Sequence, residues 1–255
     1  MALFQNLFKP QPPKPEPVQV TPVPPQLPKI QAKTAAEITK TSQPSPEAKA
    51  LLTPEQTPSQ YLGKLQEKQM GGEMVKTMAH GMPDREGVHW AAQSADKVSD
   101  KLPPSDVQAM KAAQTWAKNP TTENQTAAAA AAAKTNYNGP GALAAQGAAW
   151  AQPTTPAASS ASAAAAPRMT PHAVTGAVLM AAAIKANPAL AAPKVQAPGF
   201  QAPTLTAPAL EAPQMAGSQA PPPTVPPAVQ AQTFKEQHPF IAMGLDIASG
   251  KSGVG

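Results

Sequence analysis

Cysteine is absent from the 255-residue chain, and aromatic residues make up only 4% of it. The lack of cysteine excludes disulfide bonds and fits a reducing compartment, although many exported proteins also lack cysteine. Much of the apolar fraction is alanine. Because a core of this composition has little bulk to fill wide gaps, we expect helix backbones to pack close together.

Long apolar runs and a signal-peptide pattern are missing too. The longest apolar run, Ala173–Ile184, is interrupted by Thr175 and is shorter than the ~18 residues that suggest a spanning helix. The N-terminal residues have no basic region and only scattered apolar side chains. We therefore expect no membrane span and a cytoplasmic protein, with export by a signal-peptide-independent secretion system as the alternative.

The net charge of +5 is not concentrated on a helical stretch. Residues 1–50 carry six lysines against three glutamates, whereas residues 51–150 carry nine basic and nine acidic side chains. Phosphate contacts need a stripe or patch of basic residues, and no helical segment provides one. We expect protein partners and no nucleic acid.

Proline, by contrast, is abundant and unevenly distributed. Of the 34 prolines, nine lie between Pro10 and Pro28 and eleven between Pro188 and Pro227, where six keep a five-residue period. Segments of this kind resist secondary structure. We expect a disordered Pro/Lys-rich tail over residues 1–52 and a Pro/Ala/Ser linker over 151–168. Residues 188–233 are expected to be a linker of Pro-x-apolar pentapeptides, either a spacer or a multivalent ligand.

Residues 53–150 carry the pattern of a helical block. Thr57-Pro58-Ser59-Gln60 combines an N-cap residue, a proline at the first helical position and a capping-box glutamine. Further proline and glycine breaks divide the block into six short helices, with breaks near residues 71–72, 83–84, 103–106, 119–121 and 138–140. Because the breaks are short, neighbouring helices should be antiparallel. The expected fold is an all-α compact bundle.

Two further helices should complete the same domain. Residues 169–187 are apolar on nearly every side, which is typical of a helix buried in a bundle. Its small residues Ala173, Ala177 and Ala181 would allow close backbone contact. Residues 234–255 should form a closing helix, beginning at His238-Pro239, and a frayed end. A helix of about ten residues is marginal alone in water, so it should dock on the block. The long connection before it does not prevent this, because a loop of about 50 residues costs only ~1.4 kcal/mol more to close than one of about 10.

No catalytic, cofactor or metal signature emerges from the sequence. Gly250-Lys251-Ser252 resembles the end of a phosphate-binding loop, but the required glycine is replaced by Leu245. His80, Asp84, Glu86 and His89 are split between two helices by Pro83, so we interpret them as a solvated corner rather than a zinc site. We expect no enzyme activity and no cofactor.

The candidate partner-binding residues fall into two groups. The first is an apolar stripe at the N-terminus, which could fold on a partner as a docking helix or remain a disordered end: Leu3, Phe4, Leu7 and Phe8. The second group contains Arg85 and Glu86, which could contact a partner or form a structural ion pair, and Trp90. Trp90, Trp116 and Trp150 could form an exposed docking surface or supply bulk to an alanine-rich core.

Four sequence blocks together suggest a family. They occur in the order Leu52–Pro58, Met78–Ala91, Thr170–Val178 and Gly244–Gly250. They resemble an uncharacterised bacterial family of helical proteins often encoded beside type VI secretion spike and PAAR-like genes. The resemblance implies a secretion-associated accessory role without known catalytic residues. The expected function is a non-enzymatic adaptor that binds spike or cargo proteins; the alternative is a structural or secreted component of a contractile injection apparatus.

Overall fold

The computed structural model describes residues 22–152, 168–191 and 227–254, and within these ranges the regular secondary structure is entirely helical. The all-α prediction is confirmed. The α-helices are α1 (Ala35–Ser42), α2 (Pro46–Lys49), α3 (Pro58–Glu67), α4 (Gly71–Gly81), α5 (Asp84–Asp96), α6 (Pro104–Lys118), α7 (Thr122–Lys134), α8 (Pro140–Trp150), α10 (Thr170–Ala186) and α11 (Pro227–Ala248). Short 3-10 turns span Ser99–Lys101 and Pro188–Ala191.

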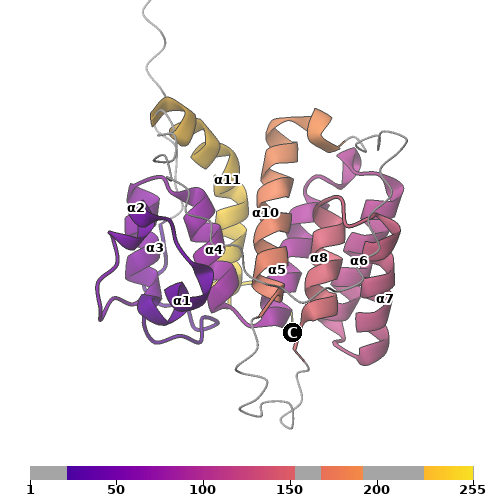
Figure 1. Cartoon of the computed structure of the whole chain (residues 1–255), viewed down its shortest axis with the longest axis horizontal. Helices are drawn as coiled ribbons and strands as arrows, with labels where there is room; N and C mark the ends of the chain where they lie inside the picture. The colour runs from indigo at the N-terminus through magenta and orange to yellow at the C-terminus, as the bar shows by residue number, and fades with distance from the viewer. Residues whose placement is uncertain (1–21, 153–167, 192–226, 255) are drawn as a thin grey trace, which may run out of the picture.

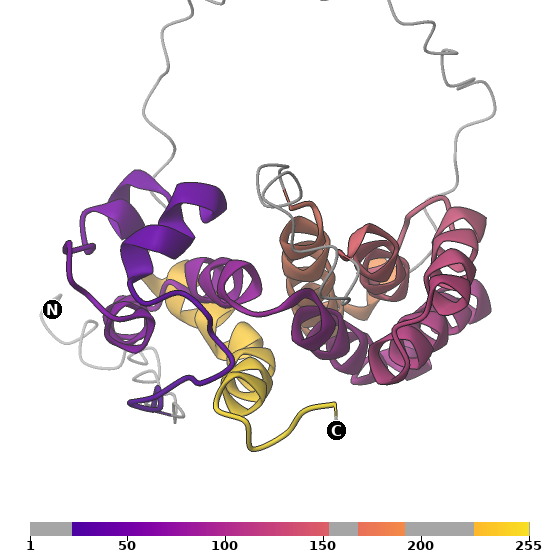
Figure 2. The same cartoon turned by 90° about the horizontal axis from the view of Figure 1, so that it is seen from below.

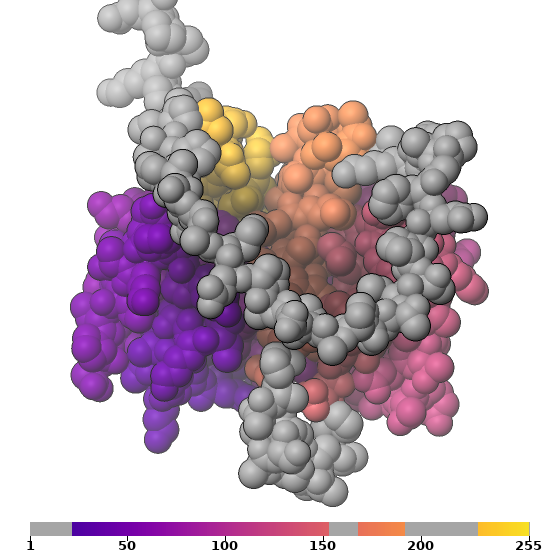
Figure 3. Space-filling model, viewed as in Figure 1, coloured from indigo at the N-terminus to yellow at the C-terminus, as the bar shows by residue number. Residues whose placement is uncertain are grey.

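The helices form two adjoining groups (Figure 1, Figure 2). The bulky lobe contains α1–α4 and α11, and the alanine lobe contains α5–α8 and α10. The lobes meet where α4 and α11 pack against α10 and where α11 reaches α5. Figure 3 shows the ends of α10 and α11 projecting on the same side of the molecule. This boundary between the lobes therefore involves four helices.

Local signals position α3 in the bulky lobe. Thr57 Oγ1 accepts a hydrogen bond from the Gln60 backbone N–H at 3.3 Å, and Gln60 Oε1 accepts one from the Thr57 N–H at 3.0 Å. This is the predicted capping box. Tyr61, Leu62 and Leu65 then face the core with no exposed area. The Tyr61 hydroxyl donates to the Ala48 carbonyl at 3.0 Å, and burial raises the pKa of Tyr61 to about 12.

Close backbone approach organises the alanine lobe, as predicted from the lack of bulk. Ala173, Ala177 and Ala181 of α10 are buried, and α10 packs against α5 and α8. Asp106 of α6 is 1% exposed and caps the start of α8, accepting hydrogen bonds from the N–H groups of Gly141 at 3.3 Å and Ala142 at 2.6 Å. A Cβ atom at Gly141 would collide with the Asp106 backbone carbonyl. Only glycine fits at this crossing.

The predicted tail over residues 1–52 is wrong for its described part, residues 22–52. This segment forms α1 and α2, and it buries Leu27, Ile30 and Ile38 in the core. The Lys29 backbone N–H donates to the Ala248 carbonyl at 3.0 Å, so the segment lies against the end of α11. Burial of these aliphatic side chains stabilises a stretch whose prolines suggested disorder.

The predicted closing helix also begins elsewhere. α11 starts at Pro227, not at Pro239, and Pro239 lies on an exposed face inside it. A proline in a helix interior costs about 3 kcal/mol because it removes a hydrogen bond and crowds the preceding turn. Phe234, one turn earlier, is 1% exposed, and burying such a side chain contributes ~1.5–3 kcal/mol. This burial offsets much or all of the cost of the proline, and the helix continues across Pro239.

The expected helix over residues 169–187 and the ends of the two linkers fall within the described residues. α10 confirms the predicted helix over residues 169–187. Pro188–Ala191, placed in the repeat linker from the sequence, forms a 3-10 turn. The period of prolines beyond it, most of the 151–168 linker and the stripe Leu3, Phe4, Leu7 and Phe8 lie outside the described residues. In the described ranges, no helix combines the length and apolar character needed to span a membrane.

Candidate helix-docking site

Trp90 of α5 is completely buried, so its prediction as an exposed docking residue is wrong. Its indole Nε1 donates a hydrogen bond to the backbone carbonyl of Phe240 in α11 at 2.9 Å. Trp116 is also buried, at 2% exposed, whereas Trp150 is 42% exposed. The alternative reading, that tryptophans supply bulk to the core, holds for Trp90 and Trp116.

Arg85 and Glu86 contact other parts of the fold. Arg85 Nε and Nη2 donate to the carbonyls of Ala117 and Lys118 at 2.7 and 3.1 Å, which satisfies the end of α6. Glu86 is 9% exposed, and its Oε1 lies 3.1 Å from Lys29 Nζ. Both side chains therefore hold elements together, with Lys29 as an ion-pair partner of Glu86, which favours a structural role over a partner contact.

Trp90 and Gly244 form the first close contact between α11 and the rest of the protein. A Cβ atom at Gly244 would lie 2.6 Å from the indole Cε2 and Cζ2 atoms, which is closer than atoms can approach. Gly244 therefore lets the tryptophan ring reach the α11 backbone and donate to Phe240. Gly244 begins the fourth sequence block, but sequence reasoning did not find its contact with Trp90, which lies about 150 positions earlier in the chain.

Gly71, at the start of α4, forms the second close contact. The three atoms nearest to a Cβ built on Gly71 all belong to α11: Gln237 Oε1, Phe234 Cδ2 at 3.1 Å and Ile241 Cδ1 at 3.2 Å. Phe234 and Ile241 are buried. On α10, the Lys185 ammonium lies 5.6 Å from the centre of the Phe240 ring, a cation–π distance. We call this surface of α4, α5 and α10 the α11 seat.

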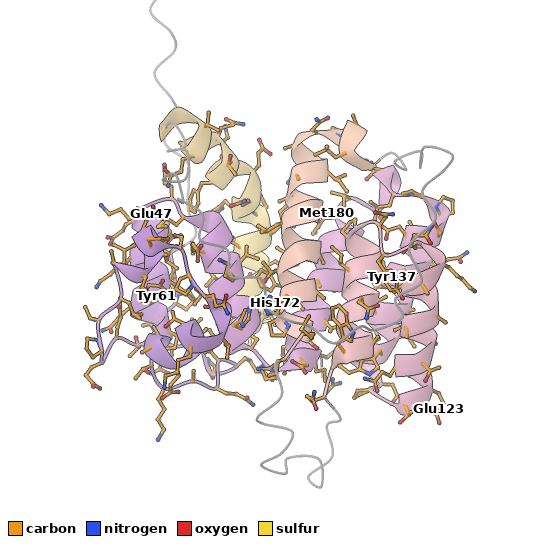
Figure 4. The ribbon with its side chains drawn as sticks, viewed as in Figure 1. Glu47, Tyr61, Glu123, Tyr137, His172 and Met180 are labelled. Carbon is orange, nitrogen blue, oxygen red and sulfur yellow. The ribbon has the colours of Figure 1, made fainter. Side chains whose placement is uncertain are left out.

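His80 and His172 meet where α4 faces α10, and Figure 4 labels His172 there. Their ring centres are 4.9 Å apart with planes nearly perpendicular, and His80 Nδ1 lies 3.2 Å from Thr41 Oγ1. Burial, together with the positive charges of His172, Arg168 and Lys76, lowers the pKa of His80 to about 4. His80 is only 8% exposed, so the predicted solvated corner is wrong at this residue.

Asp84 holds both ends of the connection between α8 and α10. Its Oδ2 accepts a hydrogen bond from the Gln152 backbone N–H at 2.9 Å, and its Oδ1 pairs with the Arg168 guanidinium. Arg168 also donates to the Met82 carbonyl at 3.3 Å. No group of three or more metal-binding side chains occurs within the described ranges. The Asp84 carboxylate holds the end of α8 and the start of α10 together.

A family model matches residues 61–198, which is more than half of the chain; it is described as a family of unknown function (DUF6931). The chain belongs to this family. The matched range contains Gly71, Trp90 and Lys185, and so the whole α11 seat, whereas α11 itself lies beyond it. Comparison with curated proteins and with solved structures found no match.

Proposed function

We propose that the protein is a non-enzymatic adaptor of a bacterial type VI secretion system, which binds a spike or cargo protein through a helical surface. The secretion link rests on the resemblance of the four sequence blocks described above. The binding role rests on one structural observation, an apolar face on α10 that is partly exposed among the described residues. The family is described as one of unknown function, so membership in it supports neither the secretion link nor the binding role.

The α10 face consists of apolar side chains that a bundle helix normally buries. Leu179, Met180 and Ala183 lie on one side of the helix, and Met180 is 39% exposed. Leu190, in the following turn, is 57% exposed. Leu143 of α8 continues the face, because a Cβ at Gly176 would lie 3.2 Å from Leu143 Cδ1. Large apolar side chains gathered on a surface favour protein contact.

Charge defines the partner that this face suits. No aspartate or glutamate occurs between Glu123 and Glu211, while Lys134 and Lys185 fall in this interval; Arg168, also within it, is paired with Asp84. Figure 4 labels Met180 on α10 and Tyr137 in the turn after α7, both in the alanine lobe; Tyr137 is 54% exposed. An apolar segment flanked by acidic residues therefore fits the α10 face best.

Affinity capture from the native bacterium with a tagged full-length chain tests the proposal. The key variant is Met180→Glu combined with Leu190→Glu, which places charge on the α10 face. Val229→Glu is the matched control, because Val229 is an apolar residue 52% exposed on α11. We expect an identified spike or cargo protein to be recovered with the wild type and the control, and lost with the double variant.

Two outcomes would contradict parts of this assignment. Equal recovery of the partner by all three chains would exclude the α10 face as the binding surface, and recovery of no secretion component would exclude the adaptor role. A second arm, Phe4→Ala with Phe8→Ala, asks whether the N-terminal stripe contributes to capture. Sheath-dependent appearance of the protein in culture supernatant would instead favour a secreted component of the apparatus.

A further inference from the structure

We propose that the α11 seat binds the α11 helix of a second copy of this chain, so that two copies can exchange these helices. This inference is independent of the adaptor function and concerns the opposite side of α10. It rests on three observations: the length of chain that precedes α11, the paired glycines of the contact, and the construction of the seat without α11.

The connection to α11 is much longer than its position requires. α10 and α11 are antiparallel neighbours, and the end of α10 and the start of α11 lie on the same side of the molecule (Figure 1). Connections between such helices usually contain 2–8 residues. Here residues 192–226, thirty-five in all, lie between Ala191 and Pro227. A chain of this length can reach up to about 120 Å, which is far enough to place α11 on another molecule.

Each of the two surfaces in the contact carries one glycine that leaves room for side chains of the other. Gly71 on the seat leaves room for Phe234, Gln237 and Ile241 of α11. Gly244 on α11 leaves room for the Trp90 ring of the seat. Neither glycine adopts a positive φ: Gly71 is the first residue of α4, and Gly244 lies within α11. Their common role is to let two separate surfaces approach closely, which is the property of a recognition contact.

The seat is built by helices that pack on one another without α11. α4 contacts α10, and α10 contacts α5 and α8. The family match covers these helices and ends before α11. The α11 sequence is the one occupant whose fit to the seat is visible in the structure, through the Trp90–Phe240 hydrogen bond and the buried Phe234 and Ile241. A second copy supplies that same helix.

Exchange preserves every contact that α11 makes, so only the tether decides between the two arrangements. Tethering α11 to its own body gives it an effective concentration on the order of 1 mM at the seat. At micromolar concentrations, each α11 should therefore occupy its own seat. The exchanged dimer should become populated as the protein concentration approaches the millimolar range, or when the intramolecular contact is blocked.

Two full-length variants block that contact from opposite sides. Gly244→Leu places a side chain against Trp90 and disables α11 but leaves the seat intact. Gly71→Leu places a side chain against Phe234 and Ile241 and disables the seat but leaves α11 intact. Each variant alone should be a monomer at 10 µM. Mixed in equal amounts, they should form a 1:1 heterodimer, visible by light scattering as a doubled mass.

Gly72→Leu is the matched control for the seat, because a Cβ at Gly72 meets no atom within 4 Å. This chain keeps α11 in its own seat, so at 10 µM only about one chain in 100 should pair with Gly244→Leu, from the ratio of 10 µM to about 1 mM. A monomeric mixture of the two blocked variants would overturn the proposal. Loss of helical circular dichroism in either one would also overturn it, because exchange requires a body that stays folded with an empty seat.

A labelled peptide of residues 227–250 gives a second readout. It should bind the Gly244→Leu chain, compete with the Gly71→Leu chain for it, and bind the wild type at least 100-fold more weakly. If Gly244→Leu bound a helix of another protein and not this peptide, the assignment to a second copy would be wrong.

Discussion

The two lobes of the protein fill their cores in different ways. The bulky lobe buries large side chains completely, among them Tyr61, Leu62, Leu65, Met74, Met78, Phe234 and Ile241. The alanine lobe buries many alanines around a few large side chains, chiefly Trp90, Met110 and Trp116; the alanines include Ala109, Ala113, Ala128, Ala132, Ala144, Ala145, Ala148, Ala177 and Ala181. In the first lobe, side chains keep the helices apart and fill the space. In the second, small residues let helices approach closely, as where a Cβ atom on Gly141 would collide with the Asp106 backbone carbonyl.

This difference determines which mutations each lobe tolerates. Where large side chains fill the space, truncation leaves a cavity, and the cost depends on how far the surroundings can collapse. Where small residues let helices approach closely, there is little to truncate, and an added methyl group collides with a neighbour. The lobes should therefore respond in opposite ways to smaller and larger residues.

The largest effect is expected from truncation in the bulky lobe. Leu65 has no exposed area, and Leu65→Ala should lower the free energy of unfolding by about 3–4 kcal/mol. Urea unfolding followed by circular dichroism measures this change. A loss below about 1 kcal/mol would indicate that the bulky lobe collapses freely, and would remove the distinction between the lobes.

A slightly smaller effect is expected from enlargement in the alanine lobe. Gly141→Ala should cost about 3 kcal/mol, because the new Cβ collides with the Asp106 carbonyl and lies 3.0 Å from Met110 Cβ. Gly63→Ala in α3 is the control: its Cβ meets no atom within 4 Å, and helix propensity should stabilise it by up to ~1 kcal/mol. Changes of the same sign in the two variants would contradict the close-approach interpretation.

The boundary between the lobes should be sensitive to acid. In the unfolded chain, His80 binds a proton below about pH 6.5, but in the fold it stays neutral until pH is close to 4. The free energy of unfolding should therefore fall by up to ~3 kcal/mol as pH decreases from 6.5 to 4. His80→Gln should flatten this dependence in urea titrations at several pH values. The pKa values of His89 and His238 are also lowered, so a residual slope should remain. Equal slopes in the two proteins would exclude His80 as the main source.

Loss of a helix cap should change the free energy of unfolding least, and by the same amount in both lobes. Thr57 caps α3 and Thr121 caps α7, each accepting from a backbone N–H at 3.3 Å. Thr57→Ala and Thr121→Ala should each lower the free energy of unfolding by about 1 kcal/mol. Thermal and urea unfolding of both variants measure the pair. A difference of more than about 1 kcal/mol between them would show that one lobe depends on local signals more than the other.

Local signals made most of the central helices predictable from the sequence. The capping box at Thr57 and the prolines at the first turn of α3, α6 and α8 act within one turn, so their effect can be read without knowing the fold. The buried character of α10 followed from its apolar residues on nearly all sides.

Contacts between distant residues were not predictable in this way. Leu27 and Ile30 are isolated among prolines, and only packing against the folded chain makes their segment ordered. The start of α11 was misplaced because proline usually begins a helix, whereas Phe234 extends this one past Pro239. The fit of Gly244 to Trp90 depends on two helices meeting in space, which no local spacing reveals.

Hydrogen exchange of the full-length protein tests most directly whether α11 is a detachable helix on a body that folds around its own core. The amides of α11 should be protected, but they should exchange through an opening of lower free energy than the amides of α5. Unprotected amides in α11 would contradict its docking. Equal opening free energies for α11 and α5 would show that α11 leaves only when the whole protein unfolds, which would contradict its detachment.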